Sequence, residues 1–137
     1  MNNTVIEITK PSVEIDAHIR NQLLTQTETL GQVVLHFFFI AHPYSEGNKI
    51  RIWPSSYLHD QHSAHSSELV HIENITLYPE WMDVDPGGQR FFSLIFDGLP
   101  KSCTVFDFIE QCDSQYGAFE VRNIQRNNTD VYYFKMS

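Results

Sequence analysis

The stretch QVVLHFFFIA, residues 32–41, decides the fold class of this protein. Residues 33–41 form the longest apolar run in the chain, and only His36 interrupts it. The run is far shorter than the roughly 20 residues that are needed to span a bilayer. Its length and its aromatic and β-branched content are typical of a strand that is buried on both faces. The run therefore predicts the centre of a β-sheet.

Shorter runs before and after this strand alternate apolar and polar residues, as strands with one solvent-facing side do. The predicted strands are residues 5–9, 49–53, 68–75, 90–97, 119–124 and 131–136. The run 32–41 is expected to form a hairpin with 49–53, and the last two runs are expected to form a hairpin around a polar loop. Residues 105–111 fit a strand or a helix.

The remaining segments read as connections. Residues 54–67 are predicted as a loop or a short irregular helix, and residues 78–88 contain the strong turn signal Asp-Pro-Gly-Gly. About eight strands without long helices favour an all-β fold, an antiparallel β-sandwich of two packed sheets.

The N-terminal 30 residues are harder to assign. The apolar positions of residues 13–19 alternate as in a strand, whereas Ile15, Ile19 and Leu23 also repeat at the four-residue steps of a short helix. We expect one domain overall, with residues 1–30 as N-terminal strands or a docking arm and residues 31–137 as the sandwich core.

Charge and composition argue against some classes of function. The 137 residues carry 9 Lys and Arg against 17 Asp and Glu, a net charge of −8. Neutralising a nucleic-acid backbone takes clustered basic residues, so direct nucleic-acid binding is not expected. The start of the chain lacks the basic and apolar regions of a signal peptide, which predicts a cytoplasmic protein with no membrane segment. Cys103 and Cys112 are then expected to be reduced thiols.

Three stretches near the C-terminus, LIFDGLPKSC (94–103), FDFIE (106–110) and NIQRN (123–127), resemble small bacterial immunoglobulin-like β-sandwich domains of unknown function. The resemblance covers roughly residues 31–137. It implies an immunoglobulin-like sandwich and supplies no catalytic residue.

Four histidines form the sharpest cluster of potential metal ligands, because neutral imidazoles suit zinc, nickel or iron. Acidic residues lie between them, but the spacing matches no known metal motif. A polar, histidine-rich loop is the alternative interpretation. The candidate transition-metal ligands are His59, His62, His65 and His71.

Aromatic residues in or beside the predicted loops offer a binding surface, since exposed planar rings act as protein hot spots or sugar platforms. The candidate partner-binding residues are Trp53, Tyr57, Tyr78 and Trp81. The sequence thus predicts a non-enzymatic binding module or accessory subunit without a cofactor, which contacts a protein partner through loop aromatics and sheet edges. Unpaired edge strands would also permit homo-oligomers. A metal-dependent enzyme using the histidines and a carbohydrate-binding sandwich are the alternatives.

Overall fold

The computed structural model describes residues 5–8, 31–44, 48–112 and 118–136, and this part of the chain is all-β. Within it, the structure contains no helix that is long and apolar enough to cross a membrane. The strands are β1 (Val5–Ile8), β2 (Val33–Ile40), β3 (Asn48–Ile50), β4 (Ser56–Asp60), β5 (Ser66–Glu73), β6 (Met82–Val84), β7 (Gln89–Phe96), β8 (Val105–Glu110), β9 (Glu120–Gln125) and β10 (Val131–Met136).

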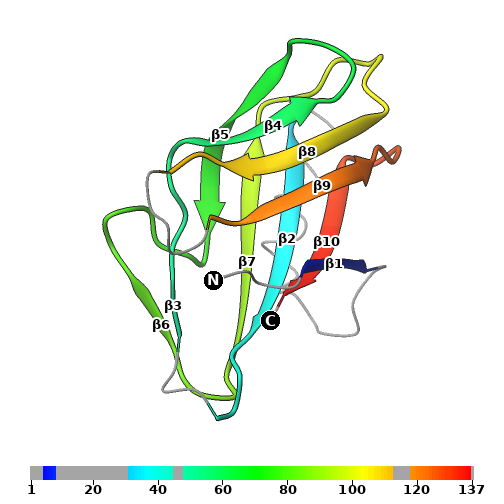
Figure 1. Cartoon of the computed structure of the whole chain (residues 1–137). Coiled ribbons are helices and arrows are strands. Elements are labelled where there is room, and N and C mark those ends of the chain that lie inside the picture. The colour runs from blue at the N-terminus through cyan, green and yellow to red at the C-terminus, as the bar shows by residue number, and fades with distance from the viewer. Residues whose placement is uncertain (1–4, 9–30, 45–47, 113–117, 137) are drawn as a thin grey trace.

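Eight strands form one mixed sheet in the order β1-β10-β2-β7-β5-β4-β8-β9, and β3 pairs with β6 in a separate two-stranded sheet. Figure 1 shows the large sheet curling until it is nearly closed into a barrel. The long strands β2 and β7 run side by side through its centre, with eight cross-strand partners in register. The small sheet extends from one end of the molecule.

The interior of the curled sheet is filled by aromatic rings. Phe37 of β2 is fully buried, and its ring stacks on the rings of its cross-strand neighbours Phe92 and Phe134 at 5.1 and 5.2 Å. The same ring lies 5.7 Å from that of Phe108 on β8, which is four strands away in the sheet order. Such a contact requires the sheet to curl, because only a curled sheet brings β8 across the interior to face β2.

The all-β prediction is confirmed, and the central strand lies where residues 32–41 placed it. The expectation of a purely antiparallel sandwich is wrong, because β10 pairs with β2 in parallel and ten strands are present in the described residues. Parallel strands need a long crossover connection. Most of the chain separates β2 from β10, so this requirement is met. The alternation of apolar and polar residues could not have predicted the parallel pair, because it carries no information about strand direction.

Several predicted connections are also corrected. The segment 54–67 is not a loop or helix, because it contains β4 and the start of β5, which pair as a hairpin. Residues 48–50 pair with β6 rather than with β2, and residues 105–110 form strand β8. The buried face of β4 carries the polar residues Ser56 and Asp60 beside Leu58, so this segment lacks the apolar and polar alternation from which strands are predicted. The alternatives for residues 13–19 lie outside the described residues.

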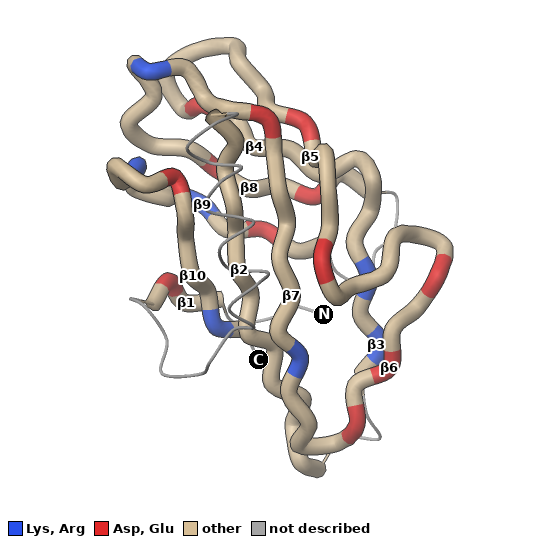
Figure 2. The backbone as a smooth tube through the Cα atoms, turned by 180° about the vertical axis from the view of Figure 1, so that it is seen from behind, with Lys and Arg blue, Asp and Glu red and all other residues tan. Residues whose placement is uncertain are grey.

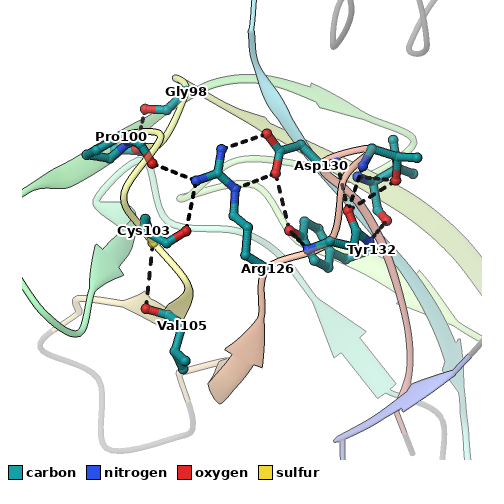
Figure 3. A network of polar contacts seen from close by, with 11 residues as sticks. Gly98, Pro100, Cys103, Val105, Arg126, Asp130 and Tyr132 are labelled. Atoms are coloured by element: carbon teal, nitrogen blue, oxygen red, sulfur yellow. Dashed lines mark hydrogen bonds and ion pairs between the residues drawn. The ribbon is translucent and has the colours of Figure 1, made fainter.

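The two C-terminal strands do not form the predicted hairpin, because β9 pairs with β8 whereas β10 pairs with β1 and β2. A polar network fixes the turn that separates them (Figure 3). Arg126 binds both carboxylate oxygens of Asp130 at 2.7 and 3.0 Å, and its Nη1 donates to the carbonyl oxygens of Pro100 and Cys103. The Tyr132 hydroxyl also donates to Asp130 at 3.2 Å. These bonds tie the turn to the loop before β8, and the two strands that the turn connects lie far apart in the sheet order.

The aromatic interior predicts that Phe37→Ala lowers the free energy of unfolding by about 3–5 kcal/mol, because the lost ring leaves a cavity among packed neighbours. Urea denaturation of the two proteins measures the change. Tyr44→Ala is the control, since Tyr44 is 91% exposed and its removal is expected to change stability by less than about 0.5 kcal/mol. A loss below about 1 kcal/mol for Phe37→Ala would contradict this account of the core.

Candidate functional site

The candidate site lies where two segments outside the large sheet are joined. Residues 51–55 follow β3, and residues 74–81 connect β5 to β6. The backbone N–H of Ile52 donates to Thr76 O at 2.9 Å, and that of Tyr78 donates to Ile52 O at 2.8 Å. A further turn bond from Glu80 N to Leu77 O, at 2.9 Å, closes the second segment. The two segments are therefore held side by side by their main chains.

An arginine and three aromatic rings form what we call the aromatic cluster: Arg51, Trp53, Tyr78 and Trp81. The guanidinium carbon of Arg51 lies 3.6, 4.6 and 5.4 Å from the ring centroids of Trp81, Tyr78 and Trp53. The rings of Trp53 and Tyr78 stack at 4.0 Å. Arg51 and Trp53 share a face because they alternate with the buried Ile50 and Ile52. Cation–π attraction stabilises such an arrangement most when the cation is partly desolvated.

Arg51 is held by a hydrogen bond at one end of its guanidinium. Its Nη1 donates to Pro79 O at 3.2 Å, and its Nε is buried with no hydrogen-bond partner among the described residues. An unpaired buried N–H costs free energy unless a group outside the chain satisfies it. Arg51 is thus positioned by one hydrogen bond and three ring contacts, and its Nε–H is an unused donor within the cluster.

Glu110 is hydrogen-bonded to the main chain of the aromatic cluster. It ends β8 and is buried, with its Oε2 accepting from Trp53 N at 3.1 Å and its Oε1 from Phe119 N at 3.2 Å. Burial raises the pKa of Glu110 to about 7, although both backbone hydrogen bonds and the nearby Arg51 charge oppose the rise. Residues 53–55 also bond to Gln111, whose N–H donates to Ser55 O at 2.8 Å. The chain before β4 is therefore drawn toward β8.

A hollow of about 220 Å³ lies between the chain before β4 and strand β5. We call it the β5 groove, and it adjoins the aromatic cluster because Pro54 and Leu77 directly follow and precede two of the cluster's rings in the sequence. Apolar groups dominate its lining. The lining residues are Pro54, Leu69, Val70, His71, Ile72 and Leu77.

Large exposed apolar side chains concentrate on this surface. Among the six that the described residues contain, four belong to the cluster or the groove, and the other two are Ile6 and Tyr44. Trp81 is 49% exposed and Val70 is 44% exposed. A contiguous exposed apolar patch of this kind marks an interaction site more often than a single exposed residue does.

The structure brings together three of the four aromatic residues that the sequence singled out, namely Trp53, Tyr78 and Trp81. Tyr57 lies apart on β4, where it is half-buried with its ring 5.9 Å from that of His59.

The four predicted metal ligands are not brought together. Nδ1 of His59 bonds Ser66 Oγ at 2.7 Å, Nε2 of His65 bonds Ser67 Oγ at 2.9 Å, and Nε2 of His71 lies 2.7 Å from Glu73 Oε1. His62 is exposed in the turn after β4. In the described ranges, no group of three or more His, Cys, Asp or Glu side chains could hold a metal ion. The β4–β5 hairpin places these imidazoles at different points along its length.

Sequence reasoning missed Arg51 and Glu110. Arg51 could have been found, because a basic residue two positions before Trp53 on an alternating strand must share its face. Glu110 gave a weaker signal: it continues the alternation of the buried Phe106 and Phe108, which places a carboxylate on the interior face.

Comparisons with family models, with curated proteins and with solved structures found no match. The resemblance to immunoglobulin-like domains therefore stays a prediction, and the site must be interpreted from its own geometry.

The raised pKa of Glu110 predicts a pH dependence of stability. The folded protein binds this proton more tightly than the unfolded chain, in which the pKa is near 4.5. Stability from this group is thus complete below pH 4.5 and is lost as the pH rises through about 7. Relative to Glu110→Gln, the free energy of unfolding of the unmodified protein should fall by up to about 3 kcal/mol over this range.

Denaturation of both proteins from pH 4.5 to 8 measures this difference. The comparison with Glu110→Gln is needed because burial lowers the pKa of His36 to about 4, which gives a dependence of opposite sign. His36 is present in both proteins, so its contribution cancels. Parallel pH curves would contradict the buried, ionisable role of Glu110.

The separated histidines predict that zinc does not stabilise the protein. Dialysed protein with a tenfold excess of ZnCl₂ should melt within about 1 °C of the metal-free sample, since a ligand raises the melting temperature only if it binds the folded state. A rise of several degrees that His59→Ala and His71→Ala abolish would restore the metal hypothesis.

Proposed function

We propose that this protein is a non-enzymatic binding module or accessory subunit that recognises a protein partner through the aromatic cluster and the β5 groove. The observation that carries the proposal is the concentration of exposed apolar side chains around a fixed arginine, on a surface built by two main-chain-bonded segments. Trp, Tyr and Arg are the residue types that dominate protein-binding hot spots.

The contacts already formed within this surface support the proposal. Association is weakened by the entropy lost when side chains become ordered, and a preorganised contact surface reduces that loss. Here the rings of Trp53 and Tyr78 are already stacked, Arg51 donates to Pro79 O, and the main-chain N–H of Trp53 donates to Glu110. Trp81 is left half-exposed on the outside of this arrangement, where a partner can cover it.

Carbohydrate binding is the second candidate, because the exposed ring of Trp81 could stack on a sugar. The adjoining groove favours a protein: sugar sites need several convergent hydrogen-bond groups around the platform, whereas this groove is mainly apolar.

Site-specific cross-linking tests the proposal. A photoreactive benzoylphenylalanine is introduced at position 81 of the full-length protein in its native cells, and at position 44 as the control. Tyr44 is the more exposed aromatic residue but lies outside the cluster. We expect irradiation to give one dominant protein adduct at position 81 and none of it at position 44.

Adducts of the same proteins at both positions would overturn the proposal, because they would report exposure rather than recognition. Binding to a glycan array that Trp81→Ala abolishes would replace the protein partner with a carbohydrate.

A further inference from the structure

The β5 groove contains an unpaired strand edge. On one side, β7 pairs with β5 from Leu69 to Glu73. On the other side, β4 pairs with β5 only from Ser66 to Glu68. No described strand pairs with residues 70–73 on that side. Val70, His71 and Ile72 of this edge line the hollow, and Val70 lies at an irregularity in the register and is 44% exposed.

The physical cause of this open edge is the path of the chain before β4. Continued antiparallel pairing would place Ser55 and Pro54 opposite Val70 and His71. Proline has no N–H to donate to a ladder, so pairing would fail at that position. Instead, residues 53–55 bond to Glu110 and Gln111 at the end of β8. An open lane is left along residues 70–73 of β5.

We infer that this lane accepts an extended peptide of a partner protein as an added strand along residues 70–73, with an apolar side chain in the hollow and basic residues at its ends. This inference rests on the proposed function and names the mode of recognition at the same site. Strand addition supplies affinity through main-chain hydrogen bonds and specificity through pockets for alternate side chains.

The chemistry of the site selects this occupant. A peptide offers N–H and C=O groups at the spacing of a strand edge, which a sugar does not. The hollow of about 220 Å³ is lined mainly by apolar groups and suits an aliphatic or aromatic side chain.

Charge defines the ends of the peptide. Glu68 and Glu73 lie at the two ends of the open edge, and the exposed Glu80 lies in the neighbouring segment. Glu73 also contacts His71, whose Nε2 lies 2.7 Å from its Oε1, so Glu68 and Glu80 are the carboxylates without such a contact to a basic side chain in the described residues. Figure 2 shows acidic residues on β5 and around β6. The basic residues in this part of the molecule lie on β3 and directly after it. Of these basic residues, the Arg51 guanidinium is already engaged by the aromatic rings. Lys or Arg at both ends of the peptide would complement the carboxylates.

The terminal strand β9 is a poorer place for strand addition. It carries a register irregularity against β8, and Asn123 within it has a left-handed φ of 60°. Arg122 is exposed on it. Bulges and charged residues are the features by which proteins discourage pairing at an edge. The open edge of β5 also has a register irregularity, at Val70, but it carries no Lys or Arg, and the groove beside it is lined mainly by apolar groups.

A peptide-selection experiment tests the inference. A phage-displayed library of random 12-residue peptides is selected on immobilised full-length protein, and the best peptide is synthesised with a fluorophore. We expect alternating apolar residues with Lys or Arg toward both ends. Its affinity, measured by fluorescence anisotropy, should weaken several-fold between 50 and 300 mM NaCl, because salt screens exposed charges.

Backbone methylation then identifies strand pairing. Methyl groups on the amides that face β5 should each weaken binding about tenfold, and methyl groups on the alternate amides should change it less than about threefold. Glu68→Gln with Glu73→Gln should reduce both affinity and salt dependence. Tyr44→Ala is the control that should leave binding unchanged.

The outcomes separate this inference from the proposed function. A selected peptide that requires Trp81 but shows no alternating methylation effect would overturn strand addition and leave the binding function standing. Failure to select any peptide, together with glycan binding through Trp81, would overturn both. Concentration-dependent dimers that Val70→Lys abolishes in sedimentation would replace the partner peptide with a second copy of this chain.

Discussion

Burial of Phe37 at the centre of β2 is the interaction on which the rest of the structure depends. Its ring contacts β7 and β10 on either side and β8 across the interior. Because one side chain contacts strands from distant parts of the sheet, the sheet must curl for the core to be filled. The curl also brings β8 across the interior, and at the end of β8 Glu110 accepts from the main chain of Trp53 in the aromatic cluster.

The site thus results from the choice between two sets of hydrogen-bond partners for the chain before β4. The chain before β4 could have continued along β5, but Pro54 cannot donate a ladder bond and Glu110 and Gln111 offer alternative partners. The second path exposes apolar groups of β5 and orders Trp53 against Tyr78. This path buries the carboxyl group of Glu110, whose pKa is raised to about 7. The free-energy cost of that burial is reduced by the hydrogen bonds that the carboxylate accepts from two backbone N–H groups.

Much of the fold could be predicted from local patterns, and the errors share one cause. The strands β2, β7, β9 and β10 were expected close to their observed bounds, because alternation and apolar runs are local properties of the chain. The expected partners of β3, β9 and β10 were wrong, and the expected direction was wrong for the parallel pair β10 and β2, because pairing depends on which edges meet after the sheet curls. Likewise, Trp53, Tyr78 and Trp81 were recognised as candidates individually, whereas Arg51 and Glu110 were recognised only through their contacts.

The sequence by itself determined an all-β fold, a central strand at residues 32–41 and an acidic chain with aromatic residues beside its turns. These follow from side-chain period and composition, which need no tertiary contact. Only the tertiary structure decided that β2 and β10 run parallel, that three aromatic rings gather around Arg51 and that β5 keeps an open edge. Each of these depends on groups far apart in the sequence, whose meeting is fixed by the packing of one shared core.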